Sequence, residues 1–338
     1  MSPDASVVVA APDKFRSTAT APQIVEAIAA GVEVAGGAVR RCPLADGGEG
    51  TLDAFGGANR WSEVTGPLGN PVRAGWRLEG TSAVLEMAQA SGLVVAGGPD
   101  GNAAETATTR GTGELLAEAI TAGATKILVG AGGSATTDGG LGAVQALLLG
   151  SHNPFRGVSV QVCADVTTAF TDAAAVFGPQ KGADPDAVAR LTARLVRTAH
   201  YYLDRFGVDV TTLPRAGAAG GLAGGLAALG AELVDGFAAI ADLAGLDAAL
   251  GGADLVVTGE GRLDRASLHG KVVGGVIGRA ARVGVPVLVI AGQLDRDVVL
   301  PTGVTAVSLA DRFGLGRALD ETTALVTDVV AHHLTAAS

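Results

Sequence analysis

Cysteine is nearly absent from this chain. Its 338 residues include two cysteines, Cys42 and Cys163. Two cysteines cannot build a disulfide scaffold, and their spacing is not that of a metal site, which favours a reducing compartment. The start of the chain also lacks the uninterrupted apolar run of a signal peptide, because the polar segment 12–16 interrupts it. We therefore expect a cytoplasmic protein.

The chain also lacks an excess of positive charge and any long run of strongly apolar residues. Its formal net charge is −10 at pH 7, and an acidic surface does not attract nucleic acid or anionic membranes at long range. The longest apolar tract, residues 216–231, has the Gly-x-x-x-Gly spacing of packed membrane helices but is short for a span and consists mainly of glycine and alanine. We expect a small-molecule partner, with no nucleic acid and no membrane.

Short apolar runs alternate with polar loops and helical patterns along most of the chain. The composition, with 48% hydrophobic residues and 51 glycines, suits a globular α/β protein. The pattern predicts strands over residues 7–10, 39–44, 127–129, 158–163, 255–257, 285–290 and 304–309. It predicts helices over residues 24–34, 52–55, 112–122, 143–149, 272–282 and 321–334, and one that Asp184 caps, with a buried face of Val188, Leu191, Leu195, Ala199 and Leu203. Repeated strand, loop and helix units indicate parallel sheets, which bind ligands at the carboxyl ends of their strands.

Residues 61–87 depart from this pattern. Their short alternating stretches, separated by turns rich in glycine and proline, predict antiparallel hairpins. This change near residue 59, and another near residue 240, predict a fold of two α/β domains. The expected arrangement is a Rossmann-like parallel-sheet domain formed by residues 1–58 and 240–338, with a mixed α/β domain, residues 59–239, inserted into it.

A glycine-rich stretch, residues 130–142, joins a predicted strand to a predicted helix. Free backbone amides at such a junction, with the hydroxyls of Ser134, Thr136 and Thr137, can donate to phosphate or carboxylate oxygens; an ordinary glycine-rich turn is the alternative. Residues 130–135 fit the dinucleotide fingerprint Gly-x-Gly-x-x-Ala, but the acidic residue expected about 20 positions later is absent. A Walker A loop is absent too, because Val272 follows Gly270-Lys271.

Lysine is rare, with four residues against twenty arginines, and three of the four lie in loops: Lys14, Lys181 and Lys271. A compact positive charge suits a transferring phosphoryl group. The same loops carry acidic residues, which are Asp13, Asp46, Glu49, Asp138, Asp165, Glu260 and Asp264. Because Mg²⁺ takes oxygen ligands and bridges nucleotide phosphates, this combination is what a Mg²⁺-dependent kinase requires, although any single acidic residue is more often a turn former or a helix cap.

Six loop blocks, taken together and in order, resemble the bacterial glycerate kinases of the glycerate 2-kinase type. The blocks are residues 11–16, 44–51, 132–140, 176–183, 217–222 and 258–264, the last accompanied by Gly270-Lys271. The resemblance implies ATP- and Mg²⁺-dependent phosphorylation of D-glycerate to 2-phosphoglycerate, or to the 3-phospho isomer. It also implies two α/β domains with the active site in the cleft between them; a homodimer is among the expected assemblies.

The resemblance also implies roles for individual residues. Lys14, Asp46, Asp165 and Lys271 would be catalytic, and the substrate would be bound by Asp13, Arg16, Gly47, Gly48 and Glu49. The nucleotide would be bound by Gly132, Gly133, Ser134, Thr136, Lys181 and Glu260. Asp138 and Asp165 would bind Mg²⁺ or orient the attacking hydroxyl, and the sequence does not separate these two roles.

The chain departs from the family pattern in four places. Ser17 stands where the family has a glycine, and Thr137 stands where it usually has an asparagine. Thr168-Ala169-Phe170 replaces the usual Asn-Pro-Leu in a shortened loop, and Ala266-Ser267 replaces the usual Gln-Thr. These departures leave open an alternative from another class, a non-catalytic protein that binds small acids or nucleotides.

Overall fold

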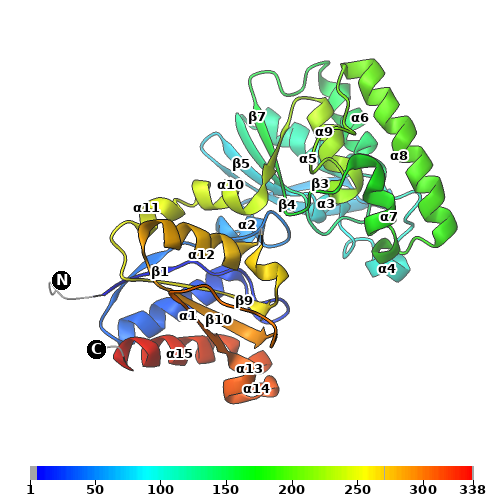
Figure 1. Ribbon diagram of the computed structural model, residues 1–338. Helices are drawn as coiled ribbons and strands as arrows, with labels where there is room; N and C mark the ends of the chain where they lie inside the picture. The colour runs from blue at the N-terminus through cyan, green and yellow to red at the C-terminus, as the bar shows by residue number, and fades with distance from the viewer. Residues whose placement is uncertain (1–5, 270, 337–338) are drawn as a thin grey trace. The chain divides into compact units, whose positions relative to one another are not determined.

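The structure, a computed structural model, describes residues 6–269 and 271–336, which form two compact units (Figure 1). The first unit holds the described residues up to Asp46, Asp53–Gly56 and those from Phe237 onward, and the second holds Gly47–Leu52 and Gly57–Gly236. The sequence analysis set these breaks after residue 58 and before residue 240. Gly270, part of the expected Gly270-Lys271 motif, lies outside the described residues.

The first unit is built on a five-stranded sheet in the order β11-β10-β9-β1-β2, and all neighbouring strands are parallel. The strands are β1 (Val7–Ala10), β2 (Ala38–Arg41), β9 (Leu255–Leu263), β10 (Val287–Leu294) and β11 (Val304–Ser308). The chain moves from β1 to β2 in one direction and from β9 to β11 in the other, so a topological switch point lies between β1 and β9. Ligands of such sheets bind beyond the carboxyl ends of the strands at this point.

Helices cover both faces of this sheet, with α1 and α15 on one face and α12 on the other (Figure 1). The helices are α1 (Ala21–Val34), α10 (Gly236–Leu243), α11 (Leu246–Leu250), α12 (Val272–Val283), α13 (Leu309–Phe313), α14 (Leu315–Asp320) and α15 (Thr322–Ala336), with a 3₁₀ turn at Ala266–Leu268. A capping box between Thr20 and Gln23 begins α1. Ile28 of α1 and Val330 of α15 are buried in the core beside the strands, so the apolar face of each helix fixes its position.

The second unit contains a six-stranded sheet in the order β3-β4-β5-β6-β7-β8. The strands are β3 (Arg60–Thr65), β4 (Pro71–Glu79), β5 (Ser82–Glu86), β6 (Lys126–Gly130), β7 (Ser159–Ala164) and β8 (Glu232–Asp235). The pairs β3/β4 and β4/β5 are antiparallel, as expected for residues 61–87, and the pairs from β5 to β8 are parallel. One parallel sheet and one mixed sheet confirm the predicted fold class of two α/β units.

The helices of the second unit are α3 (Ala88–Ser91), α4 (Gly98–Gly101), α5 (Arg110–Thr121), α6 (Leu141–Gly150), α7 (Ala173–Phe177), α8 (Pro185–Phe206) and α9 (Leu222–Ala228); α2 (Thr51–Ala54) crosses the unit boundary. The expected cap of α8 is present, because the Asp184 side chain accepts a hydrogen bond from Ala187 N. Its buried face continues with Tyr202 rather than Leu203, which is 44% exposed. None of the described helices is long and apolar enough to cross a bilayer.

Two segments expected to be loops have regular structure. Residues 258–263 continue strand β9, and Glu260 pairs with Ala291 of β10. The sequence did not predict this strand because it contains two glycines, and glycine is depleted in strands. Gly259 is nevertheless required here, since a Cβ atom at this position would lie 2.0 Å from Ile290 O. Residues 176–183 include the end of α7 and a 3₁₀ turn at Pro179–Lys181.

Candidate active site

In the first unit, the expected substrate residues follow β1 at the switch point. Beyond the end of β1 the chain stays beside β9, because Ala11 N donates to Val257 O (2.8 Å) and Asp13 N to Gly259 O (2.9 Å). Phe15 is buried and anchors this loop, whereas Lys14 is half-buried and Arg16 is exposed. The loop therefore presents Asp13, Lys14 and Arg16 at the carboxyl ends of β1 and β9.

Asp13 and Glu260 are two carboxyl groups whose pKa values are strongly raised. Burial raises the pKa of Asp13 to about 6, and the charge of Asp46 adds to this effect against the opposing charge of Lys14. Burial likewise raises the pKa of Glu260 to about 7, with Asp13 adding to the effect and Lys271 opposing it. Carboxyls that titrate close to neutral pH are candidates for proton transfer.

The same cluster includes Asp46, Asp264 and Lys271. Asp46 is 7% exposed, and Lys271 immediately precedes α12 as its N-cap residue. The Asp264 carboxylate accepts hydrogen bonds from Ser267 N (2.8 Å) and Ser267 Oγ (3.1 Å), which lower its pKa. Ser267, one of the departures from the family pattern, thus supports an acidic residue of the candidate site.

The glycine-rich stretch of the second unit begins where β6 ends and packs against residues 47–48. Ala131 N donates to Gly47 O (2.9 Å), and a Cβ atom on Gly132 would lie 2.5 Å from the Cα atom of Gly48. Gly133 is exposed and Ser134 is buried. The close approach of the two segments explains why Gly132 cannot carry a side chain, independently of any contact with a ligand.

Two residues expected to contact ligands are engaged by the loop itself. Lys181 is 2% exposed, its Nζ donates to Thr136 O (2.6 Å), and burial lowers its pKa to about 7. Asp138 accepts four hydrogen bonds, from Thr109 N (2.9 Å), Thr109 Oγ1 (2.8 Å), Gly140 N (3.0 Å) and Gly142 N (3.2 Å). These contacts favour supporting roles for both residues, because they occupy the groups that would meet phosphate or Mg²⁺.

Asp165 is exposed at the end of β7, beside a pair that the sequence analysis missed. Arg215 Nη1 donates to Ala164 O (2.7 Å), and Arg215 Nη2 donates to Asp235 Oδ2 (3.0 Å). Asp235 ends β8, so an aspartate directly after a short apolar run was the available signal. Among the described residues, no three His, Cys, Asp or Glu side chains form a ready metal-binding group.

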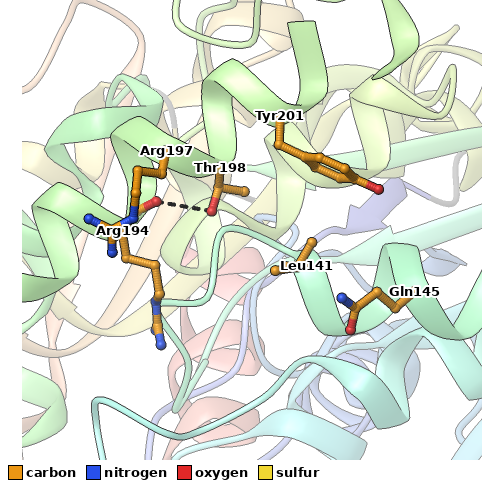
Figure 2. A pocket seen from close by; sticks show the side chains of 6 residues that line it. All are labelled: Leu141, Gln145, Arg194, Arg197, Thr198 and Tyr201. Atoms are coloured by element: carbon orange, nitrogen blue, oxygen red, sulfur yellow. Dashed lines mark hydrogen bonds between the residues drawn. The ribbon is translucent and has the colours of Figure 1, made fainter. Parts of the chain in front are cut away.

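A pocket of about 360 Å³ lies between α6 and α8 (Figure 2). Its lining residues are Leu141, Gln145, Arg194, Arg197, Thr198 and Tyr201, none of which the sequence analysis selected. Arg194 connects this pocket to the glycine-rich stretch, because its Nη2 donates to Thr137 O (2.6 Å).

Comparison with known proteins gives consistent matches over nearly the whole chain. The family model described as the glycerate kinase family matches residues 8–153 and 148–336. The chain is 39% identical over 329 residues to glycerate 2-kinase of Escherichia coli K12, and 39% identical over 328 residues to glycerate kinase of Bacillus subtilis 168; each match covers 86% of both proteins. A crystal structure from Salmonella typhimurium LT2, described as a glycerate kinase 2, matches with a TM-score of 0.83 and 37% identity, covering 99% of this chain and 100% of that one.

Proposed function

This chain belongs to the glycerate kinase family, and on that premise we propose that it transfers the γ-phosphoryl group of ATP to D-glycerate and forms 2-phosphoglycerate. The observation that carries the proposal is the cluster of Asp13, Asp46, Glu260 and Lys271 at the switch point of the first unit. Phosphoryl transfer depends mainly on positioning and on neutralising charge, and this cluster combines a cation, Lys271, with two carboxyls, Asp13 and Glu260, that titrate near neutral pH.

We assign substrate binding to the loop that follows β1 and to residues 46–49. Lys14 and Arg16 pair with the carboxylate of D-glycerate, since both cations lie on one loop beside the carboxyls. Asp46 and Glu49, with the amides of residues 47–48, bind its hydroxyl groups. A planar guanidinium and a compact ammonium together fix both the charge and the orientation of a small acid.

Asp13 is the group that accepts the proton of the attacking hydroxyl in this proposal. With a pKa of about 6, it is mostly ionised at pH 7 yet more basic than an ordinary aspartate, which suits general-base catalysis. Glu260, with a pKa of about 7, retains a proton in part of the population and hydrogen-bonds to the substrate. Lys271 neutralises the charge of the transferred group.

The nucleotide phosphates are assigned to Gly132, Gly133, Ser134 and Thr136, whose amides and hydroxyls are the donors of the glycine-rich stretch. Mg²⁺, when bound, neutralises charge on the phosphate oxygens. Asp165 is the better of its two expected ligands because it is exposed at the end of β7, whereas Asp138 already accepts four hydrogen bonds.

A coupled assay of ADP release tests this proposal. Purified protein is supplied with MgATP and D-glycerate, L-glycerate, glycolate or D-lactate, and phosphorus NMR identifies the product. The proposal expects ADP release with D-glycerate and a 2-phosphoglycerate signal. A 3-phosphoglycerate signal would correct the position of transfer. Binding of D-glycerate and MgATP by calorimetry without ADP release would instead identify the non-catalytic alternative.

A further inference from the structure

Three side chains from separate segments hold successive peptide groups of the glycine-rich stretch. The carbonyl oxygens of residues 135–137 accept hydrogen bonds, in order, from Asn102 Nδ2 (2.9 Å), Lys181 Nζ (2.6 Å) and Arg194 Nη2 (2.6 Å). The Arg194 guanidinium is cationic, and hydrogen bonds from charged donors are stronger than those between neutral groups. The backbone of residues 135–137 is therefore held by side chains outside the stretch.

The three donors are themselves fixed by contacts with the surrounding scaffold. The same amide nitrogen of Asn102 also donates to Lys181 O (2.9 Å), and Arg194 Nη1 donates to Glu105 O (2.6 Å). Asn102 directly follows α4, Lys181 ends a 3₁₀ turn and Arg194 lies on the long helix α8. Movement of any one segment would thus change the orientation of the peptide groups that it holds.

This arrangement fixes the direction of the amides that follow each carbonyl. In a trans peptide the C=O of one residue and the N–H of the next point in opposite directions, so the amides of residues 136–138 point away from the three side chains. Among the described residues, none accepts a hydrogen bond from these amides. The hydroxyls of Thr136 and Thr137 are also buried without a partner in the described part of the chain. Buried polar groups are nearly always paired, so an acceptor that a ligand supplies would satisfy these donors.

We propose that Asn102, Lys181 and Arg194 are positioning residues that orient the amides of residues 136–138 toward the phosphate groups of the nucleotide. The inference rests on the proposed nucleotide-binding role of this stretch and adds the residues that shape it. It also gives Lys181 a specific task, since its ammonium binds the loop backbone and does not need to reach the nucleotide.

Arginine substitutions on α8 provide a matched test. Arg194 and Arg197 line the same pocket (Figure 2), but the guanidinium of Arg194 holds residue 137 whereas Arg197 is exposed. We expect Arg194→Met to weaken MgADP binding, measured by calorimetry on the full chain, by about tenfold or more, the scale of a small misplacement in a binding site. Arg197→Met should bind MgADP as the wild type does. KM for D-glycerate should be unchanged in both.

Milder variants keep the test decisive if Arg194→Met does not fold. Arg194→Lys keeps the charge but has fewer donors for the two carbonyls, so it should bind MgADP with intermediate affinity. Asn102→Ala should weaken MgADP binding in the same direction, because it frees the carbonyl of residue 135. Thermal unfolding of each variant separates lost stability from lost affinity.

Three results would overturn the inference. The first is wild-type MgADP affinity in Arg194→Lys and Asn102→Ala with lowered melting temperatures, which would make the contacts purely structural. The second is an equal loss of affinity in Arg197→Met, which would point to the pocket itself. The third is a wild-type protein that does not bind MgADP. Wild-type binding of MgADP that weakens in the variants as expected, without turnover of D-glycerate, would support the inference while refuting the proposed function.

Discussion

Replacing Asp13 by asparagine should stabilise the protein at alkaline pH while impairing the reaction. Burial, chiefly, raises the pKa of Asp13 from 3.8 to about 6, a shift of about 2 pKa units that corresponds to ~3 kcal/mol. Because the folded state binds the proton more tightly than the unfolded state does, the raised pKa costs stability above pH 6, and the cost disappears as pH falls toward 4. Asparagine has no charge to bury, so Asp13→Asn removes a cost that grows in the wild type as the pH rises.

The linkage between protonation of Asp13 and folding gives the expected pH dependence of the stability. With pKa values of 3.8 unfolded and about 6 folded, the cost of ionised Asp13 is ~3 kcal/mol at pH 8 and ~1.6 kcal/mol at pH 5. The gain from Asp13→Asn should therefore be larger at pH 8 than at pH 5 by ~1.4 kcal/mol. The pKa of about 6 already includes the hydrogen bond from Lys14 N, which favours the ionised carboxylate.

Urea denaturation at pH 5 and pH 8, followed by circular dichroism, measures this difference. Asp320→Asn is the matched control, because Asp320 is an exposed aspartate in the same unit and should give the same change at both pH values. Turnover with D-glycerate should fall by about a hundredfold in Asp13→Asn, the scale of removing a general base. A gain that is equal at the two pH values, or larger at pH 5, would show that Asp13 is not held in a charge-disfavouring environment.

Four further substitutions test other parts of the site. Ser17→Gly should raise the free energy of unfolding by about 1 kcal/mol in urea denaturation, because Ser17 has a φ of 66° that glycine adopts without strain; a loss of stability would contradict this. Lys271→Met and Asp46→Asn should each lower turnover at least about tenfold, and near-wild-type rates in both would refute the functional assignment. Asp138→Asn should lower the melting temperature without changing the Mg²⁺ concentration that gives half-maximal activity, because an amide nitrogen cannot accept the hydrogen bonds of the carboxylate oxygen that it replaces.

The sequence was sufficient for the fold class and the family, since both depend on local patterns. The β-branched runs of the parallel strands and the Asp184-Pro185 start of α8 are visible within a few residues, and the six loop blocks carry the family resemblance that the comparisons confirm. The extension of β9 through residues 258–263 could not be predicted in the same way. It depends on the close approach of β10 to Gly259 and of the loop after β1 to Gly261, which are properties of the neighbouring segments.

The supporting contacts of the glycine-rich stretch were beyond prediction for a related reason. Asp138 receives hydrogen bonds from Thr109, 29 residues earlier, and Arg194 binds the carbonyl of Thr137 across 57 residues. No local pattern marks such pairs, because either partner alone resembles an ordinary polar residue of a loop or helix. They become predictable only after the fold brings α5, α8 and the end of β6 together.

The balance between burial and hydrogen bonding separates the acidic residues that the sequence grouped together. Asp13 and Asp138 both lie in loops that follow parallel strands, and both were expected to take part in the chemistry. Asp138 accepts hydrogen bonds from the N-cap residue of α5 and from the start of α6, so its charge is used to hold the backbone. For Asp13, burial and the charge of Asp46 outweigh its hydrogen bond to Lys14 N and the nearby cations, and its pKa rises. A carboxylate whose ionised form is disfavoured by burial is available to interact with a substrate. Asp13 and Glu260, rather than Asp138, are therefore the first acidic residues to test in the reaction.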